Sequence, residues 1–120
     1  WQLLAGTAFF DVGAARILEP HLDALAILDE AGVEPEETAT WGVFAAEGAG
    51  TRLTADRTDA MGWTLCGTKP WCSLAGSLSH ALVTAWVDDE QRRLFSVPLR
   101  HDTVTPHPGP WHARGLSQVV

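Results

Sequence analysis

The hydrophobic pattern of the sequence changes at one short acidic segment, residues 33–40, which contains three glutamates and a proline. Before this segment, apolar residues recur every three or four positions, which is the period of an α-helix. After it, they form short runs bounded by turn residues, which is typical of strands. We therefore expect an α+β protein, with a helical segment and its acidic linker over residues 1–40 and a β domain over residues 41–120 that is truncated at its C-terminal end.

The helical period extends from Leu3 to about Ala31 and places apolar residues on one face. Pro20 interrupts this run, so it either begins a second helix in its first turn or kinks a single longer helix. Gly32 follows at the position where glycine commonly ends a helix in a left-handed conformation. We expect the helical segment to end there.

Six short runs with apolar or alternating character follow the linker. Turn-forming residues, mainly glycine, proline and aspartate, separate them. Short strands at regular spacing, with no helical pattern between them, predict an antiparallel β-barrel or sandwich. The expected strands cover residues 41–46, 52–57, 62–66, 81–87, 94–99 and, approximately, 103–105.

Composition limits the classes of partner. Fifteen acidic and eight basic residues give a net charge of -7, and Lys69 is the single lysine, so we expect no binding of nucleic acid or anionic lipid. No apolar run approaches the length of about 18 residues that a membrane helix needs, and the N-terminus lacks the pattern of a signal peptide. A soluble, cytoplasmic protein is expected. Because the chain begins at Trp1 and ends on two valines, we also expect it to be a fragment.

Cysteine and histidine residues give weak signals. Cys66 and Cys72 have the spacing of no metal or redox motif, so two buried free thiols are expected. His101, His107 and His112 could in principle bind zinc. Their spacing fits no zinc motif, and interleaved prolines indicate an exposed loop, so we expect no metal site.

A serine nucleophile is likewise not indicated. Ser79 and His80 are adjacent, which in a strand would point them to opposite faces, and no nucleophile-elbow motif is present. A catalytic triad is therefore not expected.

Two stretches are more informative. The glycine-containing loop at residues 47–51 follows an apolar strand, and its backbone N–H groups could hold a phosphate, although a plain turn between strands is commoner. Further along, Trp71 and Ser73 would lie on one face of one strand, which makes a platform for a flat ring with a hydroxyl at its edge. A core tryptophan with a strand-end hydroxyl is the equally weighted alternative.

In order and spacing, residues 41–51 (WGVFAAEGAGT), residues 62–73 (GWTLCGTKPWCS) and the apolar run 81–85 resemble the middle β domain of the acyl-CoA dehydrogenases. The resemblance implies an FAD-dependent oxidoreductase that removes the α and β hydrogens of an acyl-CoA thioester. The α proton would go to a carboxylate base and the β hydride to flavin N5. In the family that base is a glutamate of a C-terminal four-helix domain, so no catalytic residue is assigned in this chain.

The resemblance also implies a set of binding residues. Trp71 corresponds to the tryptophan packed against the flavin ring, and Ser73 to the hydroxyl that hydrogen-bonds near flavin N5. The strand at 44–46 would meet the pyrimidine edge of the flavin and the thioester, and the loop at 50–51 the pyrophosphate and the coenzyme A side. The implied cofactor residues are thus Phe44, Ala45, Ala46, Gly50, Thr51, Trp71 and Ser73, with Ala46 and Thr51 also contacting substrate.

Three positions depart from the family pattern. Ala46 stands where the family usually has threonine, Gly48 replaces the usual proline, and Arg52 stands where an aspartate is expected. These departures leave open an alternative, a non-catalytic binding or interaction domain that kept the fold and lost the flavin chemistry. If the family's function is retained, the implied partners are an acyl-CoA substrate, an electron-transfer flavoprotein as electron acceptor, and further copies of the chain in a homo-oligomer.

Overall fold

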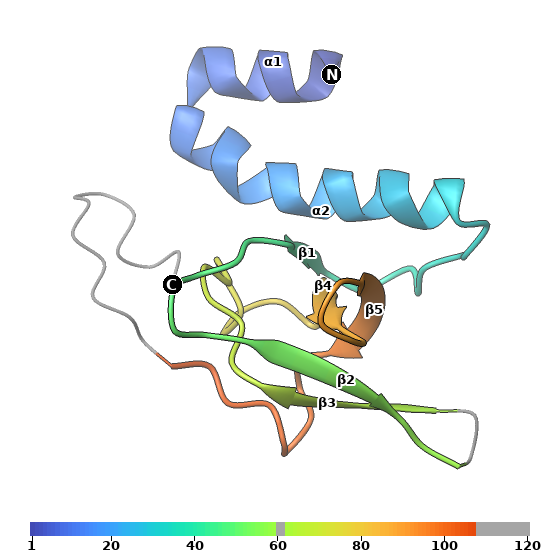
Figure 1. Ribbon diagram of the computed structural model, residues 1–120. Helices are drawn as coiled ribbons and strands as arrows, with labels where there is room; N and C mark the ends of the chain where they lie inside the picture. Colours follow the sequence, from blue (N-terminus) through green and yellow to red (C-terminus); the bar gives the residue numbers. More distant parts are fainter. Residues whose placement is uncertain (60–61, 108–120) are drawn as a thin grey trace.

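The computed structural model describes residues 1–59 and 62–107 and confirms an α+β protein with its helices first (Figure 1). Five of the six expected strands are present with boundaries close to those predicted, whereas residues 103–105 form no strand. The elements are the helices α1 (Gln2–Phe10) and α2 (Val12–Glu30) and the strands β1 (Trp41–Phe44), β2 (Leu53–Arg57), β3 (Trp63–Gly67), β4 (His80–Trp86) and β5 (Arg92–Pro98).

The break between the two helices lies at Asp11, not at Pro20. Asp11 has extended backbone dihedral angles, and its carboxylate accepts a hydrogen bond of 3.0 Å from the backbone N–H of Ala14, so it caps the N-terminus of α2. Pro20 lies inside α2, where the helix continues on both sides of it. Of the two alternatives for Pro20, the one in which it begins a second helix is therefore wrong, because that helix begins at Val12 after the Asp11 cap.

The end of α2 follows the prediction. Gly32 has a φ of 67°, its N–H donates to the carbonyl of Asp29 at 3.0 Å, and the N–H of Val33 donates to Leu28 at 2.9 Å. These two hydrogen bonds form the Schellman motif, which satisfies carbonyl groups that the end of a helix leaves unpaired. The role of Gly32 as the helix terminator is confirmed.

The sheet is mixed rather than antiparallel. Strand β4 pairs with β5 antiparallel along its whole length, with β1 in parallel from Trp41↔His80 to Phe44↔Val83, and with β2 in parallel at one position. Strands β2 and β3 form an antiparallel pair. Alternation of apolar and polar residues is the same for either strand direction, so the sequence pattern could not distinguish them.

The described strands also do not close into the predicted barrel, since the order β1-β4-β2-β3, with β5 on β4, leaves β3 and β5 unpaired with each other. The sheet nevertheless curls. Trp63 on β3 and Phe95 on β5 have ring centroids 5.4 Å apart, and the Arg93 guanidinium lies over the Trp63 ring. The described strands therefore form an open sheet in which the edge strands β3 and β5 meet through these side chains.

Two hydrophobic clusters lie on opposite faces of the sheet. Leu82 points toward α2, which covers one face, whereas its neighbours Ala81 and Val83 point to the other face, against the segment between β3 and β4. The cluster at α2 contains Ala24, Leu28, Ala39, Trp41 and Leu82; the second cluster contains Phe44, Leu74, Leu78, Ala81, Val83 and Leu99.

Helix α1 lies beyond α2, away from the sheet, and has no buried residue (Figure 1). Phe9 and Phe10 are exposed on it. Within the part of the chain that the structure describes, neither helix is long and apolar enough to cross a membrane.

Candidate functional site

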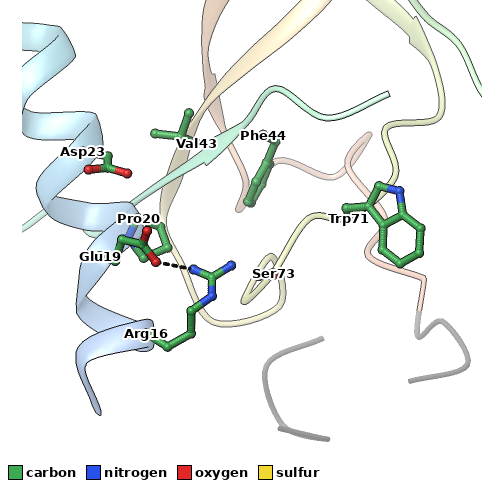
Figure 2. Close-up of a pocket in the computed structure, with 8 residues that line it drawn as sticks. All are labelled: Arg16, Glu19, Pro20, Asp23, Val43, Phe44, Trp71 and Ser73. Atoms are coloured by element: carbon green, nitrogen blue, oxygen red, sulfur yellow. Dashed lines mark hydrogen bonds and ion pairs between the residues drawn. The ribbon is translucent and has the colours of Figure 1, made fainter. Parts of the chain in front are cut away.

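A shallow pocket of about 210 Å³ lies between α2 and the segment that connects β3 to β4 (Figure 2). Three of the seven predicted cofactor residues, Phe44, Trp71 and Ser73, line it together. Helix α2 forms the opposite wall. The complete lining is Arg16, Glu19, Pro20, Asp23, Val43, Phe44, Trp71 and Ser73.

Trp71 and Ser73 reach this pocket from a turn, not from a strand as predicted. Trp71 has a φ of 61° and Leu74 a φ of 65°, both in the left-handed region, and the N–H of Ala75 donates to the carbonyl of Cys72 at 3.1 Å. The Trp71 side chain is 68% exposed and, in Figure 2, lies at the side of the pocket opposite the α2 residues. Trp71 and Ser73 are therefore brought to the pocket by a turn, and not by alternation along a strand.

The α2 wall is polar and was missed by the sequence analysis. Arg16 donates from Nη1 to Oε2 of Glu19 at 2.9 Å, and both side chains are about half exposed. Pro20 and Asp23 complete this wall. The spacing of these positions, i, i+3, i+4 and i+7, puts them on one helix face, and this spacing is the signal that could have identified them.

The other four predicted cofactor residues do not line the pocket. Ala45 and Ala46 follow the end of β1 at Phe44 and are exposed. Gly50 has a φ of 77°, and Thr51 donates from its backbone N–H to the Gly48 carbonyl at 3.2 Å, so this loop is a tight glycine turn. The structure thus separates the predicted residues into a pocket group and a loop group that follows β1.

Glu47 lies at the centre of a polar cluster that the sequence analysis also missed. Its Oε1 accepts from Lys69 Nζ at 2.6 Å and from Arg92 Nη1 at 3.2 Å, and its Oε2 accepts from Trp86 Nε1 at 3.3 Å. Lys69 also donates to Thr84 Oγ1 at 2.8 Å. The hydrogen bond from Lys69, with those from Trp86 and Arg92, lowers the pKa of Glu47 from its ordinary value of 4.5 to about 2, against the effect of desolvation.

Arg52, one of the departures from the family pattern, is engaged next to this cluster. Its guanidinium lies 4.7 Å from the centroid of the Trp86 ring, and Nη2 donates to Asp89 Oδ1 and to the Asp88 carbonyl, each at 3.1 Å. Arg92 lies over the same ring at 5.2 Å. The two arginines and the indole are thus held by cation–π contacts and polar contacts at this end of the sheet.

Ser79 and His80, expected to point to opposite faces of a strand, instead have their side chains close together at the start of β4. Ser79 Oγ accepts from the backbone N–H of Thr40 at 2.9 Å and donates to the Thr40 carbonyl at 3.0 Å, and it lies 3.0 Å from His80 Nδ1. His80 stacks on Trp41, with ring centroids 4.8 Å apart. These contacts join the start of β4 to the linker before β1.

Among residues 1–59 and 62–107, no three or more His, Cys, Asp or Glu side chains are grouped so that they could hold a metal ion. His101 and His107 are exposed. His112, the third histidine considered, lies outside the described residues.

The two cysteines differ in their environments. Cys66 is exposed on the edge strand β3, so the prediction that both thiols are buried is wrong for this one. Cys72 is partly buried, and desolvation raises the pKa of its thiol to about 11. A thiol with this pKa is only about 0.1% thiolate at pH 8.

Iodoacetamide at pH 8 should therefore alkylate Cys66 in the folded protein and Cys72 on the order of 100-fold more slowly. Peptide mass spectrometry of samples quenched at successive times would measure both rates. In denaturant, the two rates should become similar. Equal rates in the folded protein would contradict the described environment of Cys72.

The pocket is smaller than a complete small-molecule site, which is typically about 300–1,000 Å³. It offers an exposed indole and a hydroxyl on one side and charged groups on the other, which suits one edge of a flat, polar ring system.

Comparisons of the chain with protein-family models, with curated proteins and with solved structures found no match in any of the three.

Proposed function

We propose that this chain supplies part of the flavin site of an acyl-CoA dehydrogenase-like, FAD-dependent oxidoreductase. The observation that carries the proposal is the meeting of Phe44, Trp71 and Ser73 at one pocket. Phe44 is distant in the sequence from Trp71 and Ser73, and the resemblance assigns all three to the flavin. Acyl-CoA as substrate, an electron-transfer flavoprotein as acceptor, a homo-oligomeric state and a cytoplasmic location belong to the same proposal.

The residues present match one edge of a flavin ring. The exposed indole of Trp71 offers an apolar face that would pack against the ring and shield it from water. The buried Phe44 lines the pocket, and the Ser73 hydroxyl would donate to the edge of a bound flavin ring near N5, where it would stabilise negative charge. When bound, FAD would supply the hydride-accepting chemistry.

The loop after β1 suits the phosphate end of the same cofactor. Gly50 has a φ of 77° and open space where a Cβ would lie, so an anion could approach the backbone of the loop there. No basic side chain of the loop itself is needed for this role, and Arg52 is already held by Trp86 and Asp89. The catalytic base is not assigned to any residue of this chain.

Titration with FAD tests the proposal directly. The purified chain should quench flavin fluorescence, and Trp71→Leu should raise the dissociation constant by about two- to tenfold, since an aromatic stacking contact contributes about 0.5–1.5 kcal/mol. Trp1→Leu is the matched control, because Trp1 is 97% exposed and is not part of the pocket. Absence of any quenching by FAD, or an equal loss in both variants, would contradict the assignment.

The N5 assignment predicts a separate effect at Ser73. Ser73→Ala should move the midpoint potential of the bound flavin to a more negative value, because a donor at N5 stabilises the electron-rich reduced ring. Affinity for oxidised FAD should fall by only about fivefold, the loss expected for one neutral hydrogen bond. Equilibrium reduction against a reference dye measures the potential. Ser77→Ala, on the same turn but outside the pocket, should behave as the unmodified protein.

A second candidate function is a non-catalytic binding domain that kept this fold and lost the cofactor. It is favoured by the α2 wall, where two carboxylates, Glu19 and Asp23, face the pocket beside one guanidinium, Arg16. Such a wall disfavours polyanionic ligands. One measurement distinguishes the two candidate functions. After incubation with FAD and gel filtration, a flavoprotein retains the yellow flavin and a non-catalytic binding domain does not.

A further inference from the structure

The backbone at Trp71 requires an explanation that the indole itself does not provide. A non-glycine residue in the left-handed region is strained, and such strain persists only where the surroundings impose it. The Trp71 side chain is mostly exposed, so its own burial does not hold the conformation. The cause therefore lies in the residues on either side.

Upstream of Trp71, Lys69 is firmly held. Its side chain is only 7% exposed, and its ammonium group bonds both to Glu47 Oε1 and to Thr84 Oγ1. Glu47 is itself bound by Trp86 on β4. The first residue of the turn is thus fixed to the sheet through charge-assisted hydrogen bonds.

Downstream of Trp71, the turn is held by burial. Leu74 is part of the hydrophobic cluster beneath the turn, and Cys72 Sγ donates to the Lys69 carbonyl at 3.2 Å, which joins the two ends of the segment. Pro70 lies close to Gly48 in the loop after β1. The position that a Cβ on Gly48 would occupy is 3.0 Å from Pro70 Cγ. The turn and the loop after β1 therefore pack as one unit.

We infer that the ion pair between Glu47 and Lys69 is a positioning device that holds this turn so that Trp71 is presented at the pocket. The inference rests on the proposed function, in that Trp71 is the platform for the flavin ring. Glu47 and Lys69 do not line the pocket, so they act through Trp71 and not by touching the cofactor ring. The carboxylate remains ionised at neutral pH because its pKa lies near 2.

A readout that needs no flavin tests the positioning. In protein labelled with 5-fluorotryptophan, the ¹⁹F resonance of Trp71, assigned with Trp71→Phe, should shift or broaden in Lys69→Met, because the turn samples other conformations. Glu47→Gln, which keeps the shape and removes the charge, should have a smaller effect in the same direction. Asp89→Asn is the matched control, since it breaks the exposed ion pair with Arg52. An unchanged Trp71 resonance in folded Lys69→Met or Glu47→Gln would overturn the inference.

A double-mutant cycle on FAD binding tests whether Lys69 acts through Trp71. Lys69→Met alone should raise the dissociation constant on the order of tenfold, but in the Trp71→Leu background it should have almost no further effect. Equal effects in both backgrounds would show that Lys69 does not act through the indole. If the unmodified chain binds no FAD, the proposed function fails, while the ¹⁹F measurement still decides the positioning role.

Discussion

Gly67→Ala should lower the free energy of unfolding by about 3 kcal/mol or more, and in a small domain this is enough to populate unfolded protein. Gly67 ends β3 with a φ of 121°, a conformation that side chains rarely adopt. A Cβ there would also collide with the backbone carbonyl oxygen of Arg52. That oxygen accepts from the Thr68 N–H at 3.2 Å just beyond the end of the β2–β3 pair, so it cannot move away without breaking this hydrogen bond.

Chemical denaturation followed by circular dichroism measures this effect, and Gly76→Ala provides the control. Gly76 has open space around the position of a Cβ and no positive φ, so alanine should change stability by less than about 1 kcal/mol. Equal denaturation midpoints for the two variants would show that the backbone at Gly67 can relax. Because Gly67 comes shortly before the Trp71 turn, its variant should also lose FAD binding.

The parts of the fold that the sequence predicts correctly are those determined by short-range chemistry. Gly32 ends α2 because its left-handed conformation allows two terminal hydrogen bonds, and this needs only neighbouring residues. The positions of the five strands follow from runs of apolar residues and the turns between them. The position of the helix break has a local cause too, since the Asp11 side chain caps α2, and an aspartate before an apolar helical run is a helix-start signal.

Strand direction and sheet closure were not predictable from the same patterns. The connection between β3 and β4 carries the chain to the centre of the sheet, where β4 runs parallel to both β1 and β2. This path depends on how Leu74 and Leu78, from the connection itself, pack beneath the sheet. Contacts of this kind join residues distant in sequence, and period-2 alternation does not encode them.

The candidate site shows the same division. Trp71 and Ser73 are expected on one strand but lie on a turn. The turn depends on left-handed conformations at Trp71 and Leu74, and a sequence does not reveal such a conformation where the residue is not glycine. The partners of Glu47 lie on β4, on β5 and after β3, so only the folded sheet brings them together. The sequence offers one indication of this cluster, which is that Lys69 is the only lysine in a chain with fifteen acidic residues.

The second large effect is expected at Leu82, the residue of β4 that joins the sheet to the helices. Leu82 is 3% exposed and packs in the cluster with Ala24 and Leu28, so Leu82→Ala should cost about 2–5 kcal/mol through lost burial and a cavity. Because α1 buries no residue, the helices depend on this cluster for their attachment. Hydrogen exchange should therefore accelerate most in α2, while β4 and β5 stay protected.

Val83→Ala is the informative comparison, because the next residue along β4 points to the opposite face. Val83 packs with Leu74 and Leu78, so its truncation should loosen the turn that carries Trp71 and leave α2 protected. The pocket lies between the two clusters, with one wall from α2 and the other from the turn, so both variants should weaken FAD binding by different routes. Uniform acceleration of exchange in both variants would instead show that the two faces unfold as one cooperative unit.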